Sequence, residues 1–455
     1  MFTDTIFALA SGSARAAIAV MRLSGPASGT AVAALCGGGL PAPRRAALRR
    51  LRDASGAMLD RALVLWLPGP GTYTGEDCAE LHLHGGRAVI DGVADALTEG
   101  GLRPAEPGEF TRRAFLNGRM DLVAAEAVYD LIAAETSAQR RQALRQLEGA
   151  LGALYQDWAD RLRGILAYQE ALIDFPDEDL PPEVEEQLVA TLGAVRAEVR
   201  AHLDDAGRGE KLREGLFFAI SGAPNVGKST LINALAERDV AIVSEIPGTT
   251  RDVLETRVVL GGVPVTLVDT AGLREAVDAI EAEGVRRAIA RAGDADLVIK
   301  LVEVGSEPAL PRHGDRSRCV AGTGAPNEEP TGGPQTMQPP VLLVANKADL
   351  GLMGPDKALR ISAKTGMGMD ELRGRLAGAA RQMTESNGPP PLTRARHRAA
   401  LLEAHALLEA AERADLPELR GEDLRLAMRA LGRITGHVGV EDILDTVFSK
   451  FCIGK

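Results

Sequence analysis

A glycine-rich tract at residues 222–229, which reads GAPNVGKS, constrains the fold of this chain more than any other feature. It fits the pattern G-x-x-x-x-G-K-[ST] and lies between an apolar run at 216–220 and a helix-like stretch at 230–235. A strand, a glycine-rich loop and a helix in this order let backbone N–H groups surround a polyphosphate at the helix N-terminus. The tract therefore predicts a P-loop α/β domain, with Lys228 between the β- and γ-phosphates and Ser229 as a ligand of Mg²⁺.

Three further motifs follow this tract in the order that GTP-binding domains show. Asp269 closes an apolar run at 263–268, where a carboxylate suits the outer shell of Mg²⁺. Another run at 341–345 leads to the tetrapeptide NKAD at 346–349, and SAK follows at 362–364. The residues predicted to contact GTP are Asn225, Val226, Gly227, Lys228, Ser229, Thr230, Thr249, Thr250, Asp269, Gly272, Asn346, Lys347, Asp349, Ser362, Ala363 and Lys364.

Asp349 predicts a preference for guanine over adenine. Its carboxylate can accept hydrogen bonds from N1–H and from the exocyclic amine of guanine. Because adenine lacks that amine, an adenine nucleotide would leave the buried carboxylate unpaired, which disfavours its binding. The SAK tripeptide resembles the loop that lies behind the guanine base in GTP-binding proteins.

The residue after Asp-Thr-Ala-Gly bears on how GTP is hydrolysed. Many regulatory GTPases carry a water-orienting glutamine there, but this chain has Leu273, which can do no acid–base work. Asn225, together with GTTRD at 248–252, resembles GTPases that recruit a potassium ion in place of an arginine finger. Two alternatives stay open, namely Asn225 as a residue that only shapes the loop and Arg251 as an arginine finger within the chain.

Bulk properties allow several domains and favour a reducing compartment. A chain of 455 residues suggests about three domains. The four cysteines show no CxxC or metal-ligand spacing, which is typical of cytosolic proteins, and no apolar stretch is long enough to span a membrane. A net charge of -11 argues against indiscriminate nucleic-acid binding, but a local basic surface would suffice for RNA.

The composition and the spacing of apolar residues along the sequence predict three domains. Residues 1–119 read as a mixed α+β domain. Residues 120–212 and 379–455 carry apolar residues at helical spacing, so we expect one all-α bundle built from both segments. The P-loop domain, at 213–378, is inserted between them, and its segment 305–338 reads as a disordered surface loop.

The first domain is predicted to contain strands at 16–23 and 62–67 and an amphipathic helix at 89–99. Between them, at 44–52, lies the densest basic run of the chain. A solvated face or a linker is the preferred interpretation of that run.

Sequences outside the GTP-binding motifs resemble those of one family. They are TYTGED at 72–77, ELHLHGG at 80–86, PGEFT at 107–111, RAFLNG at 113–118, EDIL at 441–444 and FSKFCIGK at 448–455. All of them resemble the MnmE (TrmE) family, and the resemblance covers essentially the whole chain except 305–338. One departure is ARAA at 14–17, where the family usually has Gly-Arg-Gly-Gly, and alanine restricts positive φ in that turn.

The resemblance implies a potassium-activated GTPase that acts in the modification of the tRNA wobble uridine. It implies transfer of an aminomethyl-type (carboxymethylaminomethyl) group to C5 of the uridine, with a carbon taken from a tetrahydrofolate derivative. The implied partner is MnmG (GidA), which uses FAD and NADH. The resemblance also implies a homodimer formed through the N-terminal, folate-binding domain, a heterotetramer or larger assembly with the partner, and a cytoplasmic location without membrane contact.

The resemblance also implies roles for single residues in the GTPase domain. Asn225 and Thr249 match potassium ligands, accompanied by backbone oxygens of Ser244 and Ile246. Ser229 and Thr250 match Mg²⁺ ligands. Besides Lys228, the implied catalytic residue is Glu281, which would orient a bridging water toward the attacking water. The residues alone do not separate Glu281 from Glu275, Asp278 or Glu283.

Two assignments lie outside the GTPase domain. Cys452 matches a cysteine that the family associates with tRNA modification, and a buried small residue at a helix end is the alternative. Arg22, Glu80 and Arg119 are candidate folate-pocket residues, because charged groups suit a pterin amide edge and a glutamate tail.

Two other functions are compatible with GTP-binding motifs. A ribosome-assembly GTPase would use GTP only as a timer for binding. Alternatively, the first domain would be a folate-binding module, and GTP would have only a structural role.

Overall fold

The computed structural model describes residues 2–12, 16–174, 182–237, 255–269, 295–304, 339–352, 355–385, 388–439, 441–449 and 451–454. The chain forms two compact units. The first comprises Met1–Ala133, Ala143–Asp204 and Arg394–Lys455, and the second comprises Ala134–Gln142 and Asp205–Thr393. Within the described ranges, no helix combines the length and the apolarity needed to cross a membrane. The segment at 305–338 lies outside the described residues.

The first unit contains a six-stranded sheet in the order β3-β4-β5-β2-β1-β6. Its strands are β1 (Ile6–Leu9), β2 (Ile18–Ser24), β3 (Ala47–Arg52), β4 (Met58–Leu67), β5 (Cys78–His84) and β6 (Arg103–Pro104). Strands β1 and β6 run parallel, and the other neighbours are antiparallel. The predicted strands at 16–23 and 62–67 correspond to β2 and β4.

Helices α1 (Ser28–Leu35) and α2 (Arg87–Glu99) cover one face of this sheet. Alternate side chains of strand β4, namely Ala62, Val64 and Trp66, face these helices. They are buried in the same apolar cluster as Val32 of α1 and Val93 of α2. On the opposite face, α3 (Glu109–Leu116) contributes Phe110 to a smaller cluster with Ile6 and Ala8. The N-terminal domain is therefore α+β, as predicted.

The basic run at 44–52 includes an edge strand. Strand β3 is the last strand of the sheet on its side and pairs only with β4 among the described strands. Leu51 is buried in the core, whereas Arg50 and Arg52 are exposed. The linker interpretation is wrong for residues 47–52, and the exposed arginines discourage other strands from pairing with this edge.

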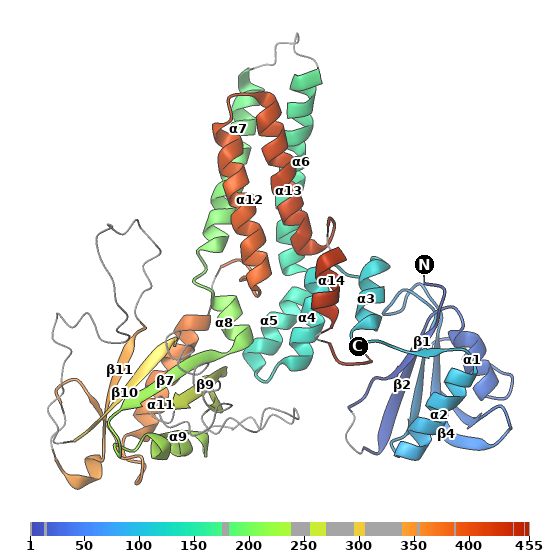
Figure 1. Cartoon of the computed structure of the whole chain (residues 1–455), viewed down its shortest axis with the longest axis horizontal. Coiled ribbons are helices and arrows are strands. Elements are labelled where there is room, and N and C mark those ends of the chain that lie inside the picture. The colour runs from blue at the N-terminus through green and yellow to red at the C-terminus, as the bar shows by residue number, and fades with distance from the viewer. Residues whose placement is uncertain are drawn as a thin grey trace, which may run out of the picture. The chain divides into compact units, whose positions relative to one another are not determined.

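Four long helices form the bundle of the first unit, as Figure 1 shows. They are α6 (Ala150–Asp174), α7 (Pro182–Leu203), α12 (Ala395–Arg413) and α13 (Pro417–Thr435). Helix α13 begins with Pro417 in its first turn and ends at Gly436, which has the left-handed conformation typical of a helix C-terminus. Because α6 and α7 precede the GTPase domain in sequence and α12 and α13 follow it, the bundle is built from both segments.

Shorter helices also belong to the first unit. They are α4 (Leu122–Ala133) and α14 (Glu441–Phe448), whereas α5 (Ser137–Leu147) is divided between the two units after Gln142. Phe448 and Phe451 pack with Leu122 and Ala125 in one apolar cluster, so the C-terminal helix is held against α4.

The second unit contains a six-stranded sheet in the order β12-β11-β10-β7-β9-β8. The strands are β7 (Leu216–Gly222), β8 (Glu255–Leu260), β9 (Val263–Asp269), β10 (Leu297–Glu303), β11 (Val341–Asn346) and β12 (Leu359–Arg360). All neighbours are parallel except β8 and β9. Helices α8 (Arg208–Glu214), α9 (Lys228–Ala236) and α11 (Met369–Thr384) are among the described helices of this unit, and the P-loop α/β prediction is confirmed.

Candidate nucleotide-binding site

The glycine-rich loop joins the end of β7 to the start of α9. Asn225 has φ 63° and Gly227 has φ 99°, so the backbone turns sharply and then enters the helix. A Cβ atom at Gly227 would overlap the side-chain amide of Asn346, which explains why glycine stands there. No side chain caps the N-terminus of α9, so its first N–H groups are available to an anion.

Lys228 is held inside this loop. Its Nζ donates hydrogen bonds to the carbonyl oxygens of Gly222 at 3.2 Å and Ala223 at 2.9 Å. The side chain is buried, whereas Ser229 and Thr230 in the same turn are exposed. The ammonium and the free helix N-terminus therefore place positive charge where the sequence predicts the phosphates of GTP.

The carboxyl ends of the parallel strands bring the predicted motifs together. Asp269 ends β9 and lies opposite Ile220 of β7 in the sheet register. Asn346 ends β11 and is almost fully buried. Its Nδ2 donates to the carbonyl of Val226 at 2.8 Å, and its Oδ1 accepts from the N–H of Ala363 at 3.0 Å. One side chain therefore connects the phosphate loop, the NKAD motif and the SAK motif.

The predicted base-binding residues lie beside Asn346. Lys347 has φ 66°, and its Nζ forms an ion pair with Glu303 at 2.9 Å. Asp349 is exposed in a short 3-10 helix, η2 (Ala348–Leu350). Ser362 is buried, and its Oγ accepts a hydrogen bond from the N–H of Thr365 at 3.2 Å, whereas Lys364 is exposed. Sequence reasoning missed Glu303, which carries no motif and ends strand β10, the neighbour of β11.

Several predicted residues lie outside the described part of the chain. They are Ser244, Ile246, Thr249, Thr250, Gly272 and Glu281, together with Leu273 and the alternatives Arg251, Glu275, Asp278 and Glu283. The described donors on the magnesium side are Ser229 and Asp269, and oxygen ligands of this kind suit Mg²⁺. The part of the site that the structure describes thus comprises the phosphate loop, the end of β9 and both base-binding motifs.

Comparisons with known proteins identify the family. A family model described as the MnmE helical domain matches residues 122–452, and one described as the GTP-binding protein TrmE N-terminus matches residues 5–119. The tRNA modification GTPase MnmE of Gluconacetobacter diazotrophicus is 60% identical over 99% of this chain and 98% of its own length. The chain belongs to the MnmE family. The protein of the same description from Granulibacter bethesdensis is 55% identical over 100% of both chains.

Solved structures are less similar to this chain than the MnmE sequences are. Era from Aquifex aeolicus, bound to GDP.AlF4-, is 24% identical and covers 44% of this chain and 69% of its own, with a TM-score of 0.24. A likeness of that size adds no argument to the assignment, which rests on the sequence relatives.

The candidate folate residues of this MnmE family member are only partly brought together. Arg22 on β2 and Glu80 on β5 are paired in the sheet register, and Arg22 Nη2 lies 2.9 Å from Glu80 Oε1. The Arg22 guanidinium also lies 5.9 Å from the ring centre of Tyr73, a residue that sequence reasoning missed. Arg119 is exposed beside the loop at Gly75, and no bond joins it to Arg22 or Glu80 within the described residues.

Cys452, the residue implied by the MnmE resemblance, is exposed. Its carbonyl oxygen accepts a hydrogen bond from the N–H of Gly108 at 3.5 Å, so the backbone around it is tied to the N-terminal domain. The alternative interpretation of Cys452 as a buried small residue is therefore wrong.

Proposed function

We propose that this chain hydrolyses GTP in a potassium-activated cycle that drives modification of the tRNA wobble uridine. As a member of the MnmE family, it is a GTP hydrolase that acts in tRNA modification. The observation that carries the GTP assignment is Asn346, which connects the phosphate loop at Val226 with the base-binding loop at Ala363. Family membership favours this function over a ribosome-assembly timer.

The proposed metal ligands extend this function. Ser229 and Thr250 would hold Mg²⁺, with Asp269 in the outer shell, and Lys228 would neutralise phosphate charge. Asn225 and Thr249, with backbone oxygens of Ser244 and Ile246, would hold K⁺. Glu281 would orient water. The support is that Ser229 and Asn225 are exposed on the phosphate loop and that Asp269 ends the strand next to β7.

The proposed partners follow the family resemblance. They are tRNA, an MnmG-like protein that carries FAD, and a second copy of this chain, in a cytoplasmic assembly. A tetrahydrofolate derivative would bind the N-terminal domain near Arg22 and Glu80, where Tyr73 adds an aromatic ring. Arg119 and Cys452 complete the proposed set. The proposed domains are 1–119, 120–212, 213–378 and 379–455.

The first test compares GTP hydrolysis in KCl and in NaCl at equal ionic strength. We expect faster turnover in KCl, because the cation would stabilise charge that develops in the transition state. The variant Asn225→Lys should bind GDP normally but show the same rate in both salts. Equal rates of the unmodified protein in both salts would contradict potassium activation and leave a GTPase that depends on Arg251 or on a partner.

A further inference from the structure

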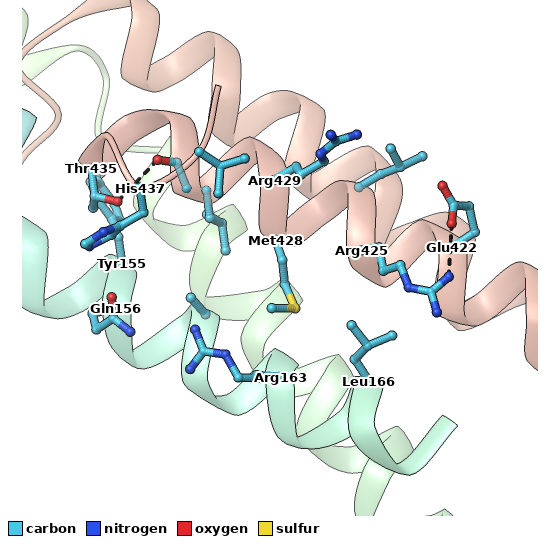
Figure 2. A pocket seen from close by; sticks show the side chains of 15 residues that line it. Tyr155, Gln156, Arg163, Leu166, Glu422, Arg425, Met428, Arg429, Thr435 and His437 are labelled. Atoms are coloured by element: carbon cyan, nitrogen blue, oxygen red, sulfur yellow. Dashed lines mark hydrogen bonds and ion pairs between the residues drawn. The ribbon is translucent and has the colours of Figure 1, made fainter. Parts of the chain in front are cut away.

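A groove between helices α6 and α13 lies within the bundle of the first unit, whereas the described GTP-binding motifs belong to the second unit. It has a volume of about 600 Å³, within the range of ligand-binding cavities. Leu166 on α6 and Leu426 and Met428 on α13 give it an apolar floor. Figure 2 shows Met428 pointing from α13 toward α6.

The rim of this α6–α13 groove is basic. Its ionisable lining residues are Arg163 on α6, Arg425 and Arg429 on α13, His437 and a single carboxylate, Glu422. Arg425 and Arg429 are four residues apart and lie about one helical turn from each other. Asp160, Glu170 and Glu422 form ion pairs with Arg163 and Arg425, so Arg429 is the rim arginine for which no carboxylate partner is found among the described residues.

Existing ion pairs leave these arginines accessible. Arg163 pairs with Asp160 on the same helix, and Arg425 pairs with Glu422 at 3.4 Å and with Glu170 at 3.0 Å. Exposed pairs of this kind contribute little stability, so a multivalent anion can replace them. Arg429 is exposed, and within the described residues it has no hydrogen-bond or ion-pair partner.

An apolar floor beside a row of arginines matches single-stranded RNA. Unstacked bases pack on apolar surfaces or guanidinium planes, while phosphates take the cationic groups. We propose that the α6–α13 groove binds a single-stranded segment of tRNA, with a base on the floor at Met428 and phosphates at Arg163, Arg425 and Arg429. This inference rests on the proposed function only in taking tRNA as the substrate.

The test measures binding of a tRNA transcript to the full chain by fluorescence anisotropy across a series of salt concentrations. Arg429→Ala and Arg163→Ala should each weaken binding about threefold to tenfold at low salt and lower the salt slope by about one. Ala159→Trp, which fills the groove without changing charge, should weaken binding with an unchanged slope. Arg413→Ala is the matched control, because Arg413 is exposed on α12 outside the groove.

Folding and function are checked in the same variants. GTP hydrolysis without tRNA should stay unchanged, because none of these residues lies in the GTPase domain. Crosslinking with 4-thiouridine-substituted tRNA should label peptides that contain Arg163 or Met428. If Arg429→Ala and Arg163→Ala bind tRNA as Arg413→Ala does, the proposal is wrong. It is also wrong if they weaken only the binding of the FAD-containing protein.

The outcomes separate this inference from the proposed function. If the unmodified chain supports wobble-uridine modification and the groove variants keep its KM for tRNA, only the groove proposal fails. If the chain binds tRNA through Arg429 but supports no modification, the groove proposal stands and the proposed function fails.

Discussion

Asn346 is the residue on which the described part of the nucleotide site depends most. Its two side-chain atoms bond to Val226 in the phosphate loop and to Ala363 in the base-binding loop. Because Asn346 is buried, water cannot replace these bonds if the side chain is removed. The phosphate and base halves of the site would then lose their common support.

We predict that Asn346→Ala weakens GDP binding at least about tenfold. The change leaves the carbonyl of Val226 and the N–H of Ala363 without their partner, at about 1–3 kcal/mol for each group. Binding of a fluorescent GDP analogue measures the effect.

Asp349→Asn serves as the contrasting variant, because Asp349 is exposed and does not tie the loops together. It should lower the preference for guanine over xanthine nucleotides and leave the thermal stability without nucleotide unchanged. Wild-type GDP affinity in Asn346→Ala would show that the connection does not matter.

At the scale of elements, a buried carboxylate joins α4 to the start of α12. Arg396 contacts both oxygens of Glu126 at 2.7 Å, and His397 Nε2 lies 3.0 Å from Oε2. Arg394 lies 3.2 Å from Oε1 and also pairs with Asp130 at 2.8 Å. Arg394, Arg396 and His397 lie at the start of α12, directly after the second unit ends at Thr393.

The electrostatics of this cluster set its protonation. Burial favours a neutral Glu126, but His397 and Arg396 outweigh it and lower the pKa of Glu126 far below 4.5. Complete burial lowers the pKa of His397 below 6.5, against the attraction of Glu126. At neutral pH we therefore expect an ionised Glu126 that accepts hydrogen bonds from Arg396 and His397.

We predict that Glu126→Gln destabilises the bundle by about 3–5 kcal/mol at pH 7, because it removes the buried charge that pairs with the half-buried Arg394 and Arg396. Urea unfolding followed by circular dichroism measures the change. Glu403→Gln is the control, because its pair with Arg433 is exposed and should contribute little.

The pH dependence follows from the direction of the shift. Since the folded-state pKa of Glu126 is lowered, its contribution is complete above 4.5 and is lost as pH falls from there toward the folded pKa. The stability gap between wild type and Glu126→Gln should therefore shrink below pH 4.5. A gap that stays constant to pH 3 would mean that the ionised carboxylate is not its source. Because the folded-state pKa of His397 is also lowered, the wild type loses further stability as pH falls below 6.5.

At the scale of the whole molecule, the chain divides into two compact units whose segments alternate along the sequence. All described nucleotide-binding residues lie in the unit that comprises Ala134–Gln142 and Asp205–Thr393. The short segment 134–142 belongs there because Gln139 and Gln142 donate hydrogen bonds to the backbone of Arg213 and Gly209.

We predict that GDP raises the unfolding temperature of one calorimetric transition and leaves the other in place. A ligand stabilises only the cooperative unit that binds it, by about 2.7 kcal/mol at a hundredfold excess over Kd. Scanning calorimetry with and without GDP tests this, and ADP is the control ligand. A single transition that shifts as a whole would show that the units unfold together.

The GTPase domain and its phosphate loop were predictable from the amino-acid sequence alone. Residues 222–229 need only a strand before them and a helix after them, and the parallel sheet then places the ends of β7, β9 and β11 at one edge. Local patterns of this kind are readable because the residues that act together are neighbours in sequence. The helical bundle was predictable for the same reason, since apolar spacing within one helix marks its buried face.

Contacts between residues far apart in the sequence became known only from the folded chain. Glu126 and Arg396 are separated by 270 positions, and no local sequence pattern predicts that they pair. The same holds for Lys347 with Glu303 and for the arginines of α6 and α13 that share one groove. The sequence gives the charge of each side chain. Its burial and its ion-pair partner depend on how distant elements pack against one another.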